Sequence, residues 1–287
     1  MLDKYIPKKI VYFLDLIRFN KPIGFLLLMW PCWFGLAYSQ KNFFDLFHLY
    51  LLFFFGSFLM RSAGCIINDL VDIKIDKKVF RTSTRPLTSN NISILSALIF
   101  LFVLLLFSFI ILFQFSLLTI IMGLSCVPLI IIYPFMKRIT YWPQLFLGIV
   151  FSWGVLITSI ELFEEIKLDY LLLYIACIFW TLSYDTIYAY QDRVDDINNN
   201  IKSSAVLLGE KGKLFIRITY FCMLMIISYL AWKSSENLVS LGVIIAILIG
   251  INILINKWKK NSAQSSNYYF QQNNLFGGII FLYLLLF

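Results

Sequence analysis

The chain has 287 residues, of which 60% are apolar and only 14% are charged. A soluble domain carries about 25% charged and about 45–50% apolar residues, so this composition excludes an ordinary water-soluble protein. The net charge of +8 does not indicate a nucleic-acid-binding protein, because the basic residues lie between apolar runs rather than along one polar face. We therefore predict a membrane protein that contacts lipids and binds no nucleic acid.

The first twenty residues mix charged and apolar side chains. Ile6, Ile10, Phe13 and Ile17 recur at helical spacing, which is typical of a helix that lies in the membrane interface. No cleavable signal peptide is apparent. We expect residues 1–20 to form an interfacial amphipathic helix.

Apolar runs of spanning length follow along the rest of the chain, since a helix needs about 17–25 apolar residues to cross the bilayer. Nine runs fit, of which the last is short: Ile23–Ser39, Leu46–Ile67, Ile92–Phe113, Leu117–Tyr133, Trp142–Ile160, Leu168–Tyr188, Leu214–Trp232, Leu238–Asn256 and Leu275–Phe287. A bundle of spans uses the whole chain. We therefore predict an all-α, polytopic membrane protein with nine transmembrane helices and a single domain over residues 1–287.

Lysine and arginine concentrate before the first span and in every second connection after it, whereas the opposite connections hold only Lys41, Lys167 and Lys233. Basic residues stay on the cytoplasmic side of a membrane. The N-terminus and the long charged loops are therefore predicted to be cytoplasmic. The absence of a transit-like N-terminus favours a bacterial inner membrane over a mitochondrial one.

Two acidic segments follow the second and sixth predicted spans, on the same side of the membrane. In the first, Asn68, Asp72 and Asp76 are spaced four residues apart and share one face of a helix. In the second, Asp185 and Asp192 precede Asp196, and we expect these three also to share a helix face. This repeated spacing at matching positions is not expected of loops that serve only solubility.

These carboxylates are costly where they lie, because like charges four residues apart repel and acids at a helix C-terminus oppose the macrodipole. A hard divalent cation offsets both costs, and Mg²⁺ usually binds one or two carboxylates together with substrate phosphates. We predict a Mg²⁺-dependent site for a phosphorylated substrate. The candidate metal ligands are Asn68, Asp69, Asp72, Asp76, Asp192 and Asp196.

Basic residues on the same side can neutralise the remaining phosphate charge. The candidates are Arg81, Arg85, Lys137, Arg138 and Lys202. No glycine-rich nucleotide loop is present, so a nucleoside triphosphate is not expected.

At these residues the chain resembles the UbiA family of intramembrane prenyltransferases, whose members carry an NDxxDxxxD segment and a second aspartate-rich segment of DxxxD type. Here these segments are Asn68–Asp76 and Asp192–Asp196. Further stretches resemble the branch of the family that acts on 4-hydroxybenzoate: Lys21–Gly24, Arg61–Cys65, Arg85–Leu87, Tyr133–Arg138 and Tyr184–Ala189. The resemblance runs in order from about Lys21 to Gly209.

The resemblance implies a ring of nine helices around a central cavity that opens sideways to lipid. It implies Mg²⁺-dependent transfer of a polyprenyl group from polyprenyl diphosphate to 4-hydroxybenzoate, ortho to the hydroxyl group, in ubiquinone biosynthesis. Asn68 and Asp72 match the family's metal–diphosphate positions in the first segment, and Asp192 and Asp196 match the second.

For the reaction itself we expect catalytic roles for Asp72, Asp192, Lys137 and Arg138, the last two as first choices for the acceptor's carboxylate. Asp185 and Tyr188 join the basic residues named above as substrate-binding candidates. Trp153, Trp180, Tyr184 and Tyr188 are candidates for an aromatic lining that stabilises an allylic cation.

Two other functions compete with this hypothesis. The first is a prenyltransferase of the same superfamily with another acceptor, such as a naphthoate, haem or an archaeal lipid precursor. The second is a cation or phosphate transporter, which would place its acids near the bilayer midplane rather than at the ends of spans. No sequence feature sets the prenyl chain length or the oligomeric state.

Overall fold

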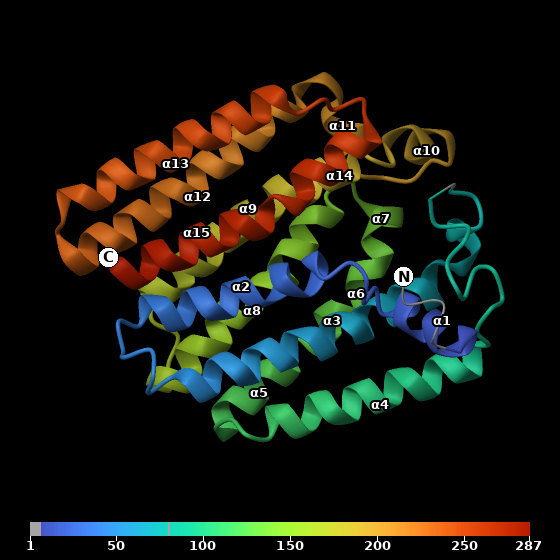
Figure 1. The fold of residues 1–287 in the computed structure, drawn as a ribbon, viewed down its shortest axis with the longest axis horizontal. Coiled ribbons are helices and arrows are strands. Elements are labelled where there is room, and N and C mark those ends of the chain that lie inside the picture. The colour runs from blue at the N-terminus through green and yellow to red at the C-terminus, as the bar shows by residue number, and fades with distance from the viewer. Residues whose placement is uncertain (1–6, 80) are drawn as a thin grey trace.

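The structure is a computed structural model that describes residues 7–79 and 81–287, and all regular structure in these residues is helical (Figure 1). The helices are α1 (Lys8–Leu16), α2 (Ile23–Tyr38), α3 (Phe47–Asp76), α4 (Ile94–Leu112), α5 (Leu117–Ser125), α6 (Val127–Ile132), η2 (Tyr133–Phe135), α7 (Met136–Ile139), α8 (Pro143–Phe163), α9 (Leu168–Ala189), α10 (Arg193–Asn198), α11 (Ser204–Leu208), η3 (Gly209–Lys211), α12 (Gly212–Ser235), α13 (Leu238–Lys257), α14 (Ala263–Gln271) and α15 (Asn273–Leu286).

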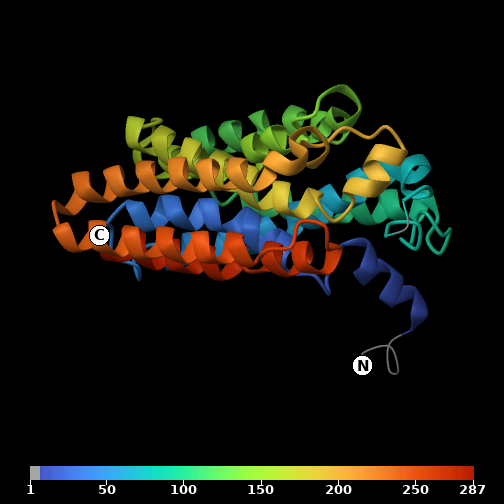
Figure 2. The same ribbon diagram turned by 90° about the horizontal axis from the view of Figure 1, so that it is seen from above.

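The long helices run side by side along the longest axis of the molecule (Figures 1 and 2). Within the described residues, seven helical segments are long and apolar enough to cross a membrane. Helix α2 is apolar but has only 16 residues, and the last predicted span, Leu275–Phe287, corresponds to α15, which has only 14. The all-helical membrane architecture is therefore confirmed, whereas the count of nine transmembrane helices stays a prediction.

The N-terminal helix is shorter than predicted. Helix α1 covers Lys8–Leu16, and Ile6, which belongs to the predicted amphipathic pattern, lies outside the described residues. Leu16 and Ile17 are buried in a small apolar cluster with Ala63 and Ile66 of α3. This packing places the connection between α1 and α2 beside the end of α3.

The fourth predicted span is interrupted where prolines occur. Pro128 lies in the first turn of α6 and Pro134 in the 3₁₀-helix η2 that follows. Proline removes a backbone donor and clashes with the preceding turn, so a continuous helix from α5 to α7 is unfavourable. The breaks carry the chain to the short helix α7, which bears Lys137 and Arg138.

Helical structure near the C-terminus begins earlier in the sequence than the last predicted span, which starts at Leu275. Residues before Leu275 are polar, and the pattern therefore excluded them, yet α14 and the start of α15 are helical. Their polar groups face partners inside the molecule: Asn274 accepts a hydrogen bond from Trp30, and Asn273 accepts from Trp180 and Tyr220. Because these partners lie far away in the sequence, hydropathy alone does not reveal the helix.

The second acidic segment does not form one helix, contrary to prediction. Helix α9 ends at Ala189, and a turn separates it from α10, which begins at Arg193. Asp195 and Asp196 thereby occupy the first turn of a new helix, where the macrodipole favours negative charge, instead of extending the C-terminus of α9. Asp185, Asp192 and Asp196 are thus distributed over two helices.

The connections rich in lysine and arginine gather at one end of the molecule, with α1, α7, α10 and α11 (right in Figure 1). The connections α2–α3, α8–α9 and α12–α13, which are poor in basic residues, lie at the opposite end. This segregation is the one that the alternating charge pattern predicts.

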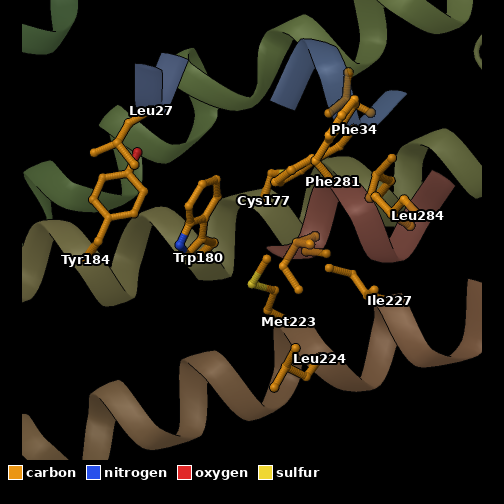
Figure 3. Close-up of a cluster of buried hydrophobic side chains, with 14 of the residues drawn as sticks. Leu27, Phe34, Cys177, Trp180, Tyr184, Met223, Leu224, Ile227, Phe281 and Leu284 are labelled. Atoms are coloured by element: carbon orange, nitrogen blue, oxygen red, sulfur yellow. The ribbon is translucent and has the colours of Figure 1, made fainter. Parts of the chain in front are cut away.

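The core of the bundle lies between α2, α9, α12 and α15 (Figure 3). Trp180 and Phe34 are fully buried, and their ring centroids lie 5.5 Å apart. Tyr184, one helical turn beyond Trp180 on α9, lies next to Leu27 at one edge of this cluster (Figure 3). The core therefore continues along α9 toward the end that carries the acidic residues.

Replacing Asn273 with alanine should destabilise this core. The side chain of Asn273 is 3% exposed, and its Oδ1 accepts hydrogen bonds from Trp180 Nε1 at 2.9 Å and from the Tyr220 hydroxyl at 2.7 Å. The variant leaves two buried donors without an acceptor, at a cost of about 1–3 kcal/mol. The thermal unfolding midpoint in detergent should fall, whereas Asn252→Ala, which removes only a bond to the preceding turn, should not lower it comparably. Equal midpoints for both variants would contradict the assignment.

Candidate active site

A cavity of about 530 Å³ opens at the end of the bundle that carries the basic connections. Its walls come from α2, α3, α8, α9 and α14, together with the segments that follow α1, α3 and α9. Both acidic segments line this one cavity. Helices α2 and α14, which lie near opposite ends of the chain, therefore line the same cavity as α3, α8 and α9.

On α3, the helical repeat brings the acids of the first segment to the cavity. Asp69 is 1% exposed and accepts two hydrogen bonds from Nη2 of Arg18, at 2.7 and 2.8 Å. Nη1 of Arg85 donates to Asp69 at 3.0 Å and to Asp76 at 2.7 Å. Arginine side chains from the connections on either side of the first two long helices thus offset the charge of Asp69 and Asp76.

Asp72 is only partly paired. Its Oδ2 accepts a short hydrogen bond from Nζ of Lys137, and Nη2 of Arg138 lies 3.5 Å from its Oδ1. That Oδ1 is buried and has no hydrogen-bond partner among the described residues. Asn68, one turn earlier, also lines the cavity, and its side chain makes no hydrogen bond with the described residues. The first segment therefore presents free oxygen atoms at Asn68 and Asp72.

The second segment reaches the cavity from two helices. Asp192 accepts hydrogen bonds from Arg81, at 2.8 Å from Nε and 2.5 Å from Nη2. Asp196 accepts a hydrogen bond from Ser203 at 3.0 Å, and burial raises the pKa of its carboxyl to about 6, with the charge of Asp192 acting in the same direction. Asp185 of α9 lines the cavity without a hydrogen bond or ion pair to the described residues.

The structure brings most of the predicted site residues together. The predicted residues that line the cavity are Asn68, Asp69, Asp72, Asp76, Arg81, Arg85, Lys137, Asp185, Tyr188, Asp192, Asp196 and Lys202. Arg138 does not line it, because its guanidinium is 44% exposed and its Nη2 donates to the backbone oxygen of Val71 at 3.0 Å. Lys202 lines the cavity, but its ammonium group donates to the backbone oxygen of Ile139.

The aromatic lining differs from the prediction. Tyr184 and Tyr188 line the cavity, whereas Trp153 and Trp180 do not. Trp180 lies in the core, and Trp153 donates from Nε1 to the backbone of Met122. The two tyrosines of the predicted lining are therefore in the cavity wall, and the two tryptophans are not.

Several cavity residues were not predicted. Arg18 was interpreted only as a topology signal, yet it binds Asp69 from a left-handed backbone conformation with φ of 60°. Arg61 lines the cavity from within the second predicted span, where a cation is expensive and for that reason indicates function. Asn267 and Gln271 of α14 also line it, and no motif in the sequence indicated them.

The oxygen-rich donor set fits a divalent cation that is shared with a phosphorylated ligand. Among the described residues, no three acidic, histidine or cysteine side chains lie close enough to enclose a metal ion by themselves. The Oδ1 of Asp72 is nevertheless a buried oxygen in the cavity wall that accepts no hydrogen bond from the described residues, with the Arg138 guanidinium 3.5 Å away. Mg²⁺ suits such a site, because it typically takes one or two carboxylates and completes its shell with phosphate oxygens and water.

The UbiA prenyltransferase family pattern matches residues 28–280 of the chain. The chain belongs to this family. It is 41% identical to a 4-hydroxybenzoate octaprenyltransferase of Blochmanniella pennsylvanica, over 96% of this chain and 95% of that protein. It is 39% identical to a protein with the same description from Aliivibrio salmonicida, over 94% of each chain.

Solved structures of UbiA homologues share the fold. A homologue from Aeropyrum pernix superposes with a TM-score of 0.71 at 18% identity, over 92% of this chain and 97% of that one. A homologue from Archaeoglobus fulgidus, solved with GPP and Mg²⁺ bound, superposes with a TM-score of 0.68 at 16% identity, over 96% of this chain and 100% of that one. The long apolar helices and the family membership together identify an integral membrane protein.

Replacing Asp69 with asparagine tests whether its pairs with Arg18 and Arg85 stabilise the protein. The substitution leaves the Arg18 and Arg85 guanidinium groups, each only about one-fifth exposed, without their shared charge partner. We expect a loss of stability on the order of 2 kcal/mol, measured as a lower thermal unfolding midpoint in detergent. Asp195→Asn is the matched control, because Asp195 has no ion pair with the described residues. An unchanged midpoint for Asp69→Asn would show that the arginine pairs contribute little.

Proposed function

We propose that this protein transfers a polyprenyl group from polyprenyl diphosphate to the ring carbon of 4-hydroxybenzoate ortho to the hydroxyl, in ubiquinone biosynthesis. The observation that carries this proposal is the single cavity, lined by both acidic segments and by basic side chains, in a chain about 40% identical to proteins named for this activity. We propose that the chain of residues 1–287 acts as a single transmembrane domain.

The carboxylates of Asp72 and Asp192, with Asn68 and Asp196 beside them, are the candidates to hold Mg²⁺ against the diphosphate. A bound Mg²⁺ ion supplies Lewis-acid stabilisation to a departing diphosphate. Mg²⁺ is favoured because all these ligands are oxygen atoms. The solved Archaeoglobus fulgidus homologue with GPP and Mg²⁺ supports this choice.

The basic residues of the cavity have distinct tasks in this proposal. Arg81 and Lys137 lie beside Asp192 and Asp72, and therefore close to where the diphosphate would bind. Arg18 and Arg85 hold Asp69 and Asp76, so we now assign these two acids to positioning rather than to metal binding. Lys202 remains a candidate for contact with the diphosphate from the cavity rim.

Arg61 is the strongest candidate for the acceptor's carboxylate. It lines the cavity and has no ion pair or hydrogen bond with the described residues, whereas Arg138, one of the two residues first expected in this role, lies outside the lining. Lys137, the other, is engaged by Asp72. A guanidinium can bind a carboxylate through two parallel hydrogen bonds, which fixes the orientation of the acid.

The transfer breaks the bond between the allylic C1 carbon and the diphosphate oxygen and forms a bond between C1 and the ring carbon. The ring carbon then loses its proton, for which Asp185 is the candidate acceptor, because its carboxylate lines the cavity and forms no hydrogen bond or ion pair within the described residues. The aromatic faces of Tyr184, Tyr188 and Phe151 line the cavity and can stabilise positive charge on the allyl group. Excluding water from this space protects the allylic cation from hydrolysis.

We further propose a bacterial inner membrane as the location, with the N-terminus and the cavity mouth on the cytoplasmic side. The supporting observations are the basic connections gathered at one end and the similarity to bacterial proteins over nearly the whole chain. Entry from this side gives water-soluble 4-hydroxybenzoate and the diphosphate headgroup access, while the prenyl tail stays in lipid.

The proposal is tested by mass analysis of the product formed in membranes that contain the protein. With polyprenyl diphosphate and 4-hydroxybenzoate supplied, we expect a prenylated hydroxybenzoate, lost on treatment with EDTA and restored by Mg²⁺. Asp72→Asn should lower the rate at least about 100-fold, whereas the matched variant Asp195→Asn should stay near the normal rate. A product formed only from a naphthoate or another acceptor would reject 4-hydroxybenzoate, and ion flux without any covalent product would favour a transporter.

Replacing Arg61 with alanine tests the assignment of the carboxylate. Loss of a buried charge pair costs at least about 2 kcal/mol, so the KM for 4-hydroxybenzoate should rise about 30-fold or more. The KM for polyprenyl diphosphate should change much less. Arg138→Ala is the comparison variant and should raise the KM for 4-hydroxybenzoate much less than Arg61→Ala does, because the Arg138 guanidinium lies outside the cavity lining, where it donates to the Val71 backbone and forms an ion pair with Asp72. The opposite pattern would return Arg138 to the role first expected of it.

A further inference from the structure

Gly24 lies where a side chain would strike Arg61. This glycine is in the first turn of α2, within the stretch Lys21–Gly24, and it lines the cavity. A Cβ atom placed on Gly24 would lie 2.7 Å from Nε, 3.2 Å from Nη2 and 3.4 Å from Cζ of Arg61. The guanidinium therefore occupies the space that any side chain at position 24 would fill.

Neither backbone conformation nor helix packing explains a glycine at this position. Gly24 is not in the left-handed region, which among the described glycines only Gly209 adopts. At Gly35 and Gly277 the added Cβ would meet Thr158 at 2.8 Å and the Trp30 ring at 2.6 Å, so these glycines permit close packing between helices. The atoms that Gly24 accommodates instead belong to the charged end of a side chain in the cavity wall.

Packing, rather than hydrogen bonding, sets where the Arg61 guanidinium lies. It has no ion pair or hydrogen bond with the described residues, and its Cζ lies 5.7 Å from the centroid of the Phe151 ring on α8. Phe151 is 8% exposed and also lines the cavity. The guanidinium thus lies near an aromatic ring and against a residue without a side chain, and it interacts electrostatically with Asp185.

We propose that Gly24 is a positioning residue for the aromatic acceptor. By leaving its side-chain space empty, it lets the Arg61 guanidinium lie where the acceptor's carboxylate can bind with the ring facing the allylic carbon. This inference rests on the proposed function and on the assignment of Arg61 to the carboxylate. It explains why a glycine follows Lys21-Pro22-Ile23 in a stretch that has no acid, base or nucleophile beyond Lys21.

The test is Gly24→Ala. The added methyl group must displace the far end of a flexible side chain, which moves without disturbing the helix backbone, so the thermal unfolding midpoint should not change. The KM for 4-hydroxybenzoate should rise about tenfold, because a displacement near 1 Å at a binding group can cost up to about 100-fold. The KM for polyprenyl diphosphate should stay within about twofold of normal.

Gly64→Ala is the matched control. Gly64 lies on α3, three residues after Arg61, and a Cβ atom there would meet nothing within 4 Å. This variant adds the same methyl group near the same arginine without touching its guanidinium. Both KM values should remain normal, and a tenfold effect at Gly64 equal to that at Gly24 would overturn the inference.

A double-mutant cycle separates an effect through Arg61 from a direct clash with the substrate. In the Arg61→Ala background the guanidinium is absent, so adding Gly24→Ala should lower kcat/KM for 4-hydroxybenzoate by less than about twofold. A tenfold loss that persists in this background would mean that the methyl group strikes the substrate itself, and would overturn the inference.

The two proposals fail in different ways. If Arg61→Ala raises the KM for 4-hydroxybenzoate and Gly24→Ala does not, the positioning role of Gly24 is wrong and the proposed function stands. If Arg61→Ala leaves that KM unchanged, the assignment of Arg61 is wrong, and the role of Gly24 falls with it, even where the prenylated product still forms.

Discussion

Buried carboxylates at the end of α3 are tolerable only because guanidinium groups from neighbouring segments reach them. Both Asp69 and Asp76 are buried on α3, and Asp76 is its last residue, where the macrodipole opposes negative charge; breaking a buried pair costs several kcal/mol. Arg18 approaches from the segment after α1 and Arg85 from the segment after α3. Neutralising these acids therefore brings two connections over the end of the bundle, and those connections form part of the cavity wall.

The cavity acids divide into two groups by their partners. Asp69, Asp76 and Asp192 accept hydrogen bonds from arginines, whereas Asp72 keeps one buried oxygen without a hydrogen bond and the Asp185 carboxylate forms neither a hydrogen bond nor an ion pair within the described residues. The first group uses its charge to order the surrounding chain. The second group retains carboxylate oxygen atoms that can bind a cation, a substrate group or a proton. Spacing alone does not make this distinction, because Asp72 and Asp76 belong to different groups and yet stand four residues apart on one face of α3.

Features set by local periodicity could be predicted from the sequence, and features set by tertiary partners could not. The apolar runs and the shared face of Asn68, Asp72 and Asp76 follow from helix geometry, and the structure has them. The polar helix α14 and the break before α10 depend on distant contacts or on the direction of a new helix dipole. Arg61 could have been predicted as a functional residue, because a cation inside an apolar run is costly unless it has a role.

Because α2 and α14 both border the cavity, its enclosure depends on segments separated by most of the chain. During synthesis on the ribosome, α2 and α3 emerge long before α14 exists. Asn273 and Asn274 of α15 are made after Trp30, Trp180 and Tyr220, which donate hydrogen bonds to them in the folded chain. The acidic residues of α3 therefore lie in an incomplete cavity until translation is nearly finished. The cavity can hold a ligand only after α14 has been made and packed.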